Sequence, residues 1–199
     1  TVVSSLDIIM AEKIVETLKR SSVTSGIVNL VDSVRYSVLN QLQVENYSVF
    51  YHNFKSMMDK VVVDHEEETI QVYDLKCTWN VENFFEEYYL YRRSYIQAYL
   101  YKKAAEHIPT QLGSEYQGYT VLNPRFIVCD SANYYSPLVY TLSDKDMLDA
   151  EQGFEYKGRT YPGVESLIRS LKWATDNNIW HISEENFLSD GIINIRTQW

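Results

Sequence analysis

Two apolar runs joined by a short acidic segment constrain the fold of this chain more than any other feature. Residues 57–63 end in the β-branched run Val61-Val62-Val63, and residues 69–77 alternate between apolar and polar side chains. β-Branched and alternating residues favour strands, and the polar segment 64–68 between them is typical of a turn. A run of charges in such a place is far more often a solvated turn than a metal site. We therefore predict a hairpin of two neighbouring antiparallel strands with a solvated tip.

Helical patterns precede and follow this hairpin. Ser4 or Ser5 can cap a first helix whose apolar residues reach Leu18 at helical spacing, and a short helix through Ile27 follows a break. We expect the other elements in this chain order: an extended segment at 47–54, a long helix at 82–105, strands at 125–129 and 138–142, and helices at 144–152 and 164–177. This order predicts an α/β (α+β) fold in which a central mixed β-sheet is flanked by helices.

The length of the chain fits one domain. Its 199 residues can bury a substantial core and show no internal repeat or linker, so we expect a single domain over residues 1–199. The sequence contains no apolar run of about 18 residues, the length needed to span a membrane, and no secretory signal. The two cysteines, Cys77 and Cys129, do not have the spacing of a zinc site. We therefore expect a protein of the reducing cytoplasm without a membrane partner.

The formal net charge of −9 bears on nucleic-acid binding. Affinity for a phosphate backbone comes mainly from Lys and Arg, so this charge argues against a protein that simply coats DNA. A nuclease remains compatible with it, because basic residues can line one groove while divalent metal ions offset the carboxylates.

Asp74 and Lys76 are the centre of the chemistry that the sequence indicates. Positions i and i+2 of a strand point to the same face, so this carboxylate and this ammonium are expected side by side. A carboxylate suits Mg²⁺ or Mn²⁺, and a lysine can position a water molecule or stabilise charge on a phosphate. Asp59 starts the preceding strand, and the hairpin can bring it beside Asp74. Alone, an Asp-x-Lys tripeptide is usually a surface ion pair, and Asp59 could equally cap its strand and face water.

The predicted long helix adds three polar side chains. Gln97 and Tyr101 are four residues apart and hence on one helical face, and Arg93 is expected one turn earlier on that face. Together they could contact a phosphate backbone or support the active-site groups. For Tyr101 alone, one of 17 tyrosines, a place in the core or an interface is the more common outcome.

In this order, these residues resemble the motifs of the PD-(D/E)xK nuclease superfamily. The matching stretches are Lys55-Ser56-Met57-Met58-Asp59, Tyr73-Asp74-Leu75-Lys76-Cys77-Thr78 and Gln97-Ala98-Tyr99-Leu100-Tyr101. Their spacing resembles the exonuclease branch, which contains lambda-exonuclease-like, RecE-like and RecB-type nucleases of phage and prophage kind. The resemblance covers most of the chain, and its specific motifs lie between residues 45 and 101. It implies a restriction-endonuclease-like exonuclease fold.

The resemblance also implies roles for single residues. In that branch the first Asp and the acidic residue before x-Lys hold divalent metal, the Lys assists hydrolysis, and a QxxxY helix follows. A Glu that enters the first strand there corresponds to Glu45. The implied set is the catalytic Asp59, Asp74 and Lys76, the supporting or DNA-binding Gln97, Tyr101 and Arg93, and the Mg²⁺ or Mn²⁺ ligands Asp59, Asp74, Leu75 through its backbone carbonyl, and Glu45.

Two features depart from the branch. Its members often carry an active-site His on a helix well before the first strand, whereas this chain has no histidine before His52. Because the chain starts at Thr1, we expect that N-terminal helical segment upstream of the residues given. Some relatives bind an iron–sulfur cluster through four cysteines, which two cysteines cannot provide.

The function implied by the resemblance is a Mg²⁺-dependent exonuclease on the ends of linear duplex DNA, acting in recombination or repair. Its RecE-like members form rings around DNA and work with a single-strand annealing protein, so we expect a ring-shaped homo-oligomer and such a partner. Two alternatives stay open. One is an endonuclease of the same superfamily, and the other is a catalytically inactive module that keeps the nuclease fold for DNA binding or assembly.

Overall fold

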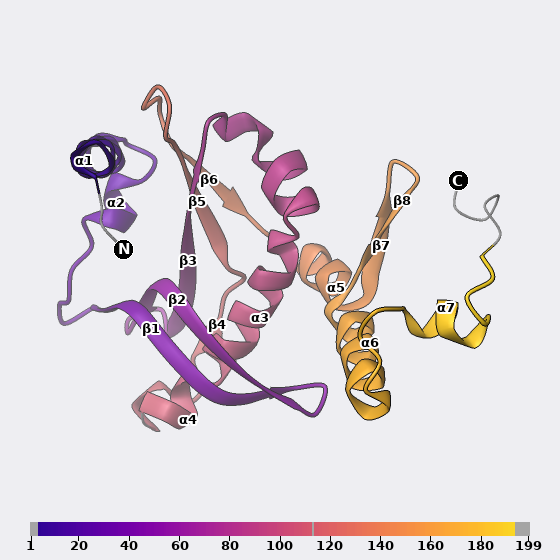
Figure 1. The fold of residues 1–199 in the computed structure, drawn as a ribbon. Coiled ribbons are helices and arrows are strands. Elements are labelled where there is room, and N and C mark those ends of the chain that lie inside the picture. Colours follow the sequence, from indigo (N-terminus) through magenta and orange to yellow (C-terminus); the bar gives the residue numbers. More distant parts are fainter. Residues whose placement is uncertain (1–3, 113, 194–199) are drawn as a thin grey trace.

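A six-stranded mixed sheet forms the centre of the protein (Figure 1). The computed structural model describes residues 4–112 and 114–193. The strand order is β1-β2-β3-β5-β6, and β4 pairs with the free edge at the start of β3. The strands are β1 (Tyr36–Val49), β2 (His52–Asp64), β3 (Thr69–Thr78), β4 (Thr120–Val121), β5 (Arg125–Asp130) and β6 (Leu138–Thr141). Consecutive strands are antiparallel from β1 to β3, whereas β3 and β5 are parallel, so the predicted mixed sheet is confirmed.

Helices cover both faces of this sheet, as Figure 1 shows. The α-helices are α1 (Ser5–Arg20), α2 (Ser25–Val28), α3 (Ser94–Glu106), α4 (Ile108–Leu112), α5 (Asp144–Gln152), α6 (Val164–Asn177) and α7 (Glu184–Leu188). Shorter elements are the 3₁₀ turns η1 (Val81–Asn83) and η3 (Ser114–Tyr116), the π-helix η2 (Phe85–Tyr91), and a second hairpin of β7 (Gly153–Tyr156) and β8 (Arg159–Pro162). Within the described ranges no helix is both long and apolar enough to cross a bilayer.

The period-2 pattern of the strands divides the core between the two faces. Val61 and Val63 on β2 and Val72 on β3 are fully buried in the large cluster that includes α3. Their neighbours Val62 and Tyr73 point to the opposite face and pack with residues of α1. Successive strand residues alternate between faces, so one apolar run supplies both layers. The run that was predicted as a strand is therefore buried on both sides.

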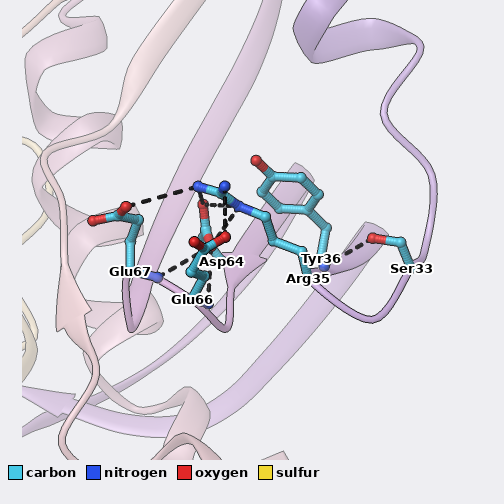
Figure 2. Close-up of polar contacts among 6 residues, drawn as sticks. All are labelled: Ser33, Arg35, Tyr36, Asp64, Glu66 and Glu67. Carbon is cyan, nitrogen blue, oxygen red and sulfur yellow. Dashed lines mark hydrogen bonds and ion pairs between the residues drawn. The ribbon is translucent and has the colours of Figure 1, made fainter.

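The β2–β3 turn is the acidic segment, and Arg35 holds it together (Figure 2). Nε and Nη2 of Arg35 donate to the carboxylate of Asp64 at 3.1 and 2.8 Å, and Nη1 lies 2.7 Å from Glu66. Asp64 Oδ1 in turn accepts hydrogen bonds from the backbone N–H groups of Glu66 and Glu67. The predicted hairpin is confirmed, and its tip is fixed by one guanidinium in addition to being solvated.

The boundaries of three helices agree with the sequence. Ser4 and Asp7 form a capping box at the start of α1, and Ser143 and Asp146 form one at the start of α5. Helix α6 begins after Gly163 without a side-chain cap, and both α5 and α6 have the boundaries expected for 144–152 and 164–177. A side-chain oxygen at the N-cap satisfies a backbone N–H that would otherwise have no partner. These three predicted helices are confirmed.

One other expectation was met in part, and one was wrong. The segment expected to be extended over 47–54 is extended at the end of β1 and the start of β2, but Phe50 and Tyr51 between them form a hairpin turn with left-handed φ values of 48° and 66°. Positive φ at both central residues is what a two-residue hairpin turn of this type requires. The single helix expected over 82–105 is interrupted, because Arg93 has a φ of 57° and separates the π-helix from α3.

Candidate active site

The site lies where β2 and β3 stop pairing. Their register runs from Asp64–Thr69 to Lys60–Tyr73. The next residues are Asp59 on β2 and Asp74 on β3, one from each strand of the fork. Residues that face each other across antiparallel strands project to the same side, so the hairpin brings the two carboxylates together. Beyond the fork β3 continues alongside β5, which keeps its direction fixed.

Asp59 links the two strands where the backbone ladder has ended. Its Oδ2 accepts a hydrogen bond of 2.9 Å from the N–H of Leu75, and its Oδ1 accepts one of 3.3 Å from Nε2 of Gln41. The first of these bonds satisfies an N–H that β2 no longer reaches with a carbonyl. Asp59 is half-buried rather than fully solvated, so it does more than end its strand.

Asp74 is the most deeply buried group of the site, with 2% of its surface exposed. Its Oδ2 is ion-paired with the ammonium of Lys76, and its Oδ1 accepts a hydrogen bond of 3.2 Å from Nε2 of Gln97. Burial raises the pKa of Asp74 above its usual value; Lys76 opposes this shift and the nearby carboxylate of Asp59 adds to it. A buried carboxylate beside a second one is disfavoured in its charged form unless a cation compensates it.

Gln97 and Tyr101 bring helix α3 to the two strands. Oε1 of Gln97 accepts a hydrogen bond of 2.9 Å from Lys76, and Nε2 donates to Asp74 and to the hydroxyl of Tyr101. The opposite amide orientation would place NH₂ against an ammonium and a carbonyl against a carboxylate, so this one is required. The Tyr101 hydroxyl donates to the carbonyl of Met57 at 2.8 Å. Burial raises the pKa of Tyr101 to about 12, which keeps it a neutral donor.

The residues present fit a divalent cation. Asp74 Oδ2 is buried, and the Lys76 ammonium is its one partner in the described part of the chain, so a cation can still share this oxygen. Mg²⁺ is commonly held by one or two carboxylates, with waters and substrate phosphates completing its shell. Asp59 and Asp74 supply that number. No group of three or more His, Cys, Asp or Glu side chains gathers among the residues described, so a third carboxylate does not join them.

Glu45 is not brought to this site. It lies on β1 opposite Lys55 of β2, and its carboxylate is 2.9 Å from the ammonium of that lysine. Lys55 precedes Asp59 by four residues, which corresponds to about 13 Å along a strand. The Lys55 ammonium also lowers the pKa of Glu45, so this carboxylate is already engaged in a cross-strand pair.

Arg93 does not share the helical face of Gln97. Because its backbone is left-handed, it precedes α3 instead of forming part of it, and its side chain is exposed. Its charge lowers the pKa of the Tyr95 hydroxyl, which burial raises.

The Leu75 carbonyl lies on β3 between Asp74 and Lys76, in the same residue whose N–H donates to Asp59.

Two contributors could not be identified from the sequence. Gln41 reaches Asp59 from β1 with a left-handed φ of 52°, and the carbonyl of Met57 anchors Tyr101. A backbone carbonyl has no sequence signature, and an isolated glutamine far from the motifs gives no signal of its own. Both depend on how β1 and β2 are curved next to the fork.

No family model and no curated protein matches this chain. Among solved structures, it is similar to the crystal structure of a candidate exonuclease from Eubacterium rectale, with a TM-score of 0.56 and 12% sequence identity. The match covers 89% of this chain and 56% of that one, so this chain spans little more than half the length of that neighbour. At this identity the likeness concerns the fold alone, a mixed sheet flanked by helices that this chain shares with that structure.

Proposed function

We propose that this protein is a metal-dependent deoxyribonuclease with Asp59, Asp74 and Lys76 at the centre of its active site. The observation that carries the proposal is their convergence at the fork between β2 and β3, where the buried Asp74 carboxylate has Lys76 as its only cationic partner among the described residues and lies near the charge of Asp59. Two carboxylates that repel each other and one lysine beside them have a clear use around a cation and a phosphate. They have little use as a purely structural cluster.

Asp59 and Asp74 would hold Mg²⁺ or Mn²⁺ through their carboxylate oxygens. When bound, such an ion polarises a phosphodiester and lowers the pKa of a water molecule. The protein's own contribution is to fix both carboxylates on strands that diverge, with Asp59 tied to the N–H of Leu75. Hydrogen bonds from neighbouring groups that fix the ligands in place increase the affinity of such sites for the metal ion.

Lys76 would stabilise the negative charge that develops on the phosphate. Its side chain is 18% exposed, so its ammonium reaches the site from a largely dry environment where its charge acts strongly. Gln97 accepts from it and keeps it directed at the fork. Tyr101 in turn holds Gln97 and is itself anchored to the carbonyl of Met57.

The substrate proposed is linear double-stranded DNA, degraded from its ends in recombination or repair. This finer assignment is supported by the order of the sequence motifs and by the fold shared with a candidate exonuclease. A ring-shaped oligomer with a positive channel would reconcile DNA binding with a net charge of −9, since only the channel must attract phosphate. A single-strand annealing protein is the partner expected for such an enzyme.

The test is the Lys76→Ala variant assayed with Mg²⁺ on linear and closed circular duplex DNA. Loss of cleavage with an unchanged circular dichroism spectrum is expected, while the exposed Lys145→Ala variant should keep native activity. Full activity of Lys76→Ala would overturn the proposed site. In the native protein, digestion of linear DNA alone indicates an exonuclease, and cleavage of closed circles indicates an endonuclease.

An inactive DNA-binding or assembly module is the second candidate. It is favoured by the position of Glu45, which leaves two carboxylates where a third ligand was expected. Calorimetric titration with Mn²⁺ separates the two functions. Heat that disappears in Asp74→Asn supports the nuclease, and the absence of carboxylate-dependent binding supports the module.

A further inference from the structure

Cys77 and Cys129 lie side by side on neighbouring strands. They are directly paired in the parallel register of β3 and β5, on the face opposite to Asp74 and Lys76. They are the only two cysteines of the chain. Any disulfide within one molecule must therefore join these two residues.

The distance between the two sulfur atoms is 3.2 Å. A disulfide bond is about 2.05 Å long and joins residues with Cα atoms about 4.4–6.8 Å apart. Neighbouring strands are spaced by about 4.8 Å, which falls within that interval. Bond formation thus requires the sulfurs to approach by about 1.2 Å, a distance that side-chain rotation and a small shift of the two strands can supply.

The two thiols differ in access to solvent. Cys77 is exposed, whereas Cys129 is 2% exposed and packs with Ile127 and Tyr73 in the core under α1. The Cys129 thiol also lies 3.3 Å from the carbonyl oxygen of Lys76, to which it can donate. An oxidant from solvent can therefore reach one thiol, and the other is held next to it as the second reactant.

We propose that Cys77 and Cys129 form a peroxide-oxidisable dithiol that closes to an intramolecular disulfide. The Cys77 sulfur attacks one oxygen of a hydroperoxide; an S–O bond forms, the O–O bond breaks, and water or an alcohol leaves. The Cys129 sulfur then attacks the Cys77 sulfenic acid; an S–S bond forms, the S–O bond breaks, and the thiol proton leaves with hydroxide as water. The two thiols lose two electrons, and the peroxide gains them.

Such a bond would be reversible by a dithiol reductant. Disulfides in reducing compartments are usually transient, because thiol reductants reopen those that they can reach. The exposure of Cys77 gives a reductant the same access as the oxidant. This inference does not depend on the proposed nuclease activity, since it concerns the opposite face of β3.

The test is mass spectrometry of the native protein treated with hydrogen peroxide. We expect the intact mass to fall by about 2 Da, the two hydrogens lost in forming one disulfide, and both thiols to be inert to iodoacetamide even after the protein is unfolded in denaturant. Trypsin cleaves after Lys76, Arg92, Arg125 and Lys145, so the bond should appear as peptide 77–92 joined to peptide 126–145. Dithiothreitol should restore the original mass and both thiols.

Two serine variants provide matched controls. Cys129→Ser should leave Cys77 to gain oxygen or to form dimers between molecules, and Cys77→Ser should leave Cys129 unmodified because it is buried. Oxygen gain on Cys77 of the native protein without the loss of two hydrogens would overturn the proposal, as would a disulfide between two chains. The native measurement decides the question even if a variant fails to fold.

Discussion

Oε1 of Gln97 on α3 lies 2.9 Å from Nζ of Lys76 on β3. This one hydrogen bond connects the helix to the lysine proposed to act on the phosphate, and the same amide donates to Asp74. The two ends of the Gln97 amide therefore contact the ammonium of Lys76 and the carboxylate of Asp74. The amide can do so because one end only accepts and the other only donates.

Gln97→Glu is expected to shift the pH dependence of cleavage. The new carboxylate would face Asp74 where Nε2 now donates at 3.2 Å, and like charges this close raise a pKa further. We expect the acidic limb of the pH–rate profile to move to higher pH, because Asp74 then ionises only at a higher pH. The rate should recover at higher pH, where Asp74 ionises again. The exposed Gln117→Glu variant is the control, and an unchanged pH–rate profile for Gln97→Glu would contradict this role.

Asp59→Asn should separate metal binding from folding. The asparagine keeps a side-chain oxygen that can accept from the Leu75 N–H, so the melting temperature should stay near the native value. The negative charge is lost, and we expect affinity for Mn²⁺ to fall at least on the order of tenfold in calorimetry. Asp59→Ala removes this hydrogen bond, and because the bond is exposed we expect it to cost only about 0.5–1.5 kcal/mol of unfolding free energy as well. Native metal affinity in Asp59→Asn would remove Asp59 from the site.

The stabilisation of the protein by Mg²⁺ should increase with pH. Burial raises the folded-state pKa of Asp74 above its usual value, so without metal this group lowers stability as the pH rises through that shifted value. A bound cation favours the ionised form and must displace the proton at lower pH. The rise in melting temperature caused by Mg²⁺ should therefore be larger at neutral pH than in acid. Asp74→Asn should show no such rise at either pH, and an equal rise in both proteins would contradict the assignment.

Oxidation of the dithiol is expected to slow cleavage. Cys77 follows Lys76 directly on β3, and the Cys129 thiol lies 3.3 Å from the Lys76 carbonyl. A displacement of about 1 Å in a positioned group can cost on the order of a hundredfold in rate. We expect the activity of peroxide-treated protein to fall at least about tenfold and to return with dithiothreitol. The activity of a Cys77→Ser/Cys129→Ser double variant should be insensitive to peroxide. Full activity of protein whose disulfide is verified by mass would show that the two sites are independent.

Local signals account for the parts of the fold that the sequence predicted. The valine run, the alternation of β3 and the capping boxes act over a few residues, so the hairpin and helices α1 and α5 could be predicted, and helical spacing of apolar residues sufficed for α6. The proximity of Asp59 and Asp74 follows from the same hairpin, since its turn length sets which residues face each other.

Features that depend on backbone deviations could not be predicted in this way. The left-handed Arg93 breaks a segment of strong helical pattern, and the register of β1 places Glu45 opposite Lys55 instead of beside the fork. The two left-handed aromatic residues at the hairpin tip have none of the Asn or Gly character that usually marks such a turn. Tertiary packing overrides local propensity at each of these positions.

Arg35→Ala is expected to destabilise the fold without affecting the active site. Arg35 binds the carboxylate of Asp64 with two nitrogens and reaches Glu66, so its removal leaves clustered negative charges at the β2–β3 turn. The Arg35 guanidinium holds the pKa of Asp64 below its usual value. A depressed pKa gives stability that is present above the unfolded value and lost as the pH falls through the folded one. The loss in melting temperature should thus be clear at neutral pH and shrink in acid.

Arg35→Lys is the matched variant, because it keeps the charge but cannot form the two-nitrogen contact with Asp64. We expect it to lie between the native protein and Arg35→Ala in melting temperature, and high salt should reduce both differences. Asp64 is five residues from Asp59, about 17 Å along β2, so Mg²⁺-dependent cleavage should be unchanged in both variants below their melting temperatures. A pH-independent loss of stability would mean that packing of Arg35 on the ring of Tyr36, whose centroid is 5.1 Å away, matters more than its ion pairs.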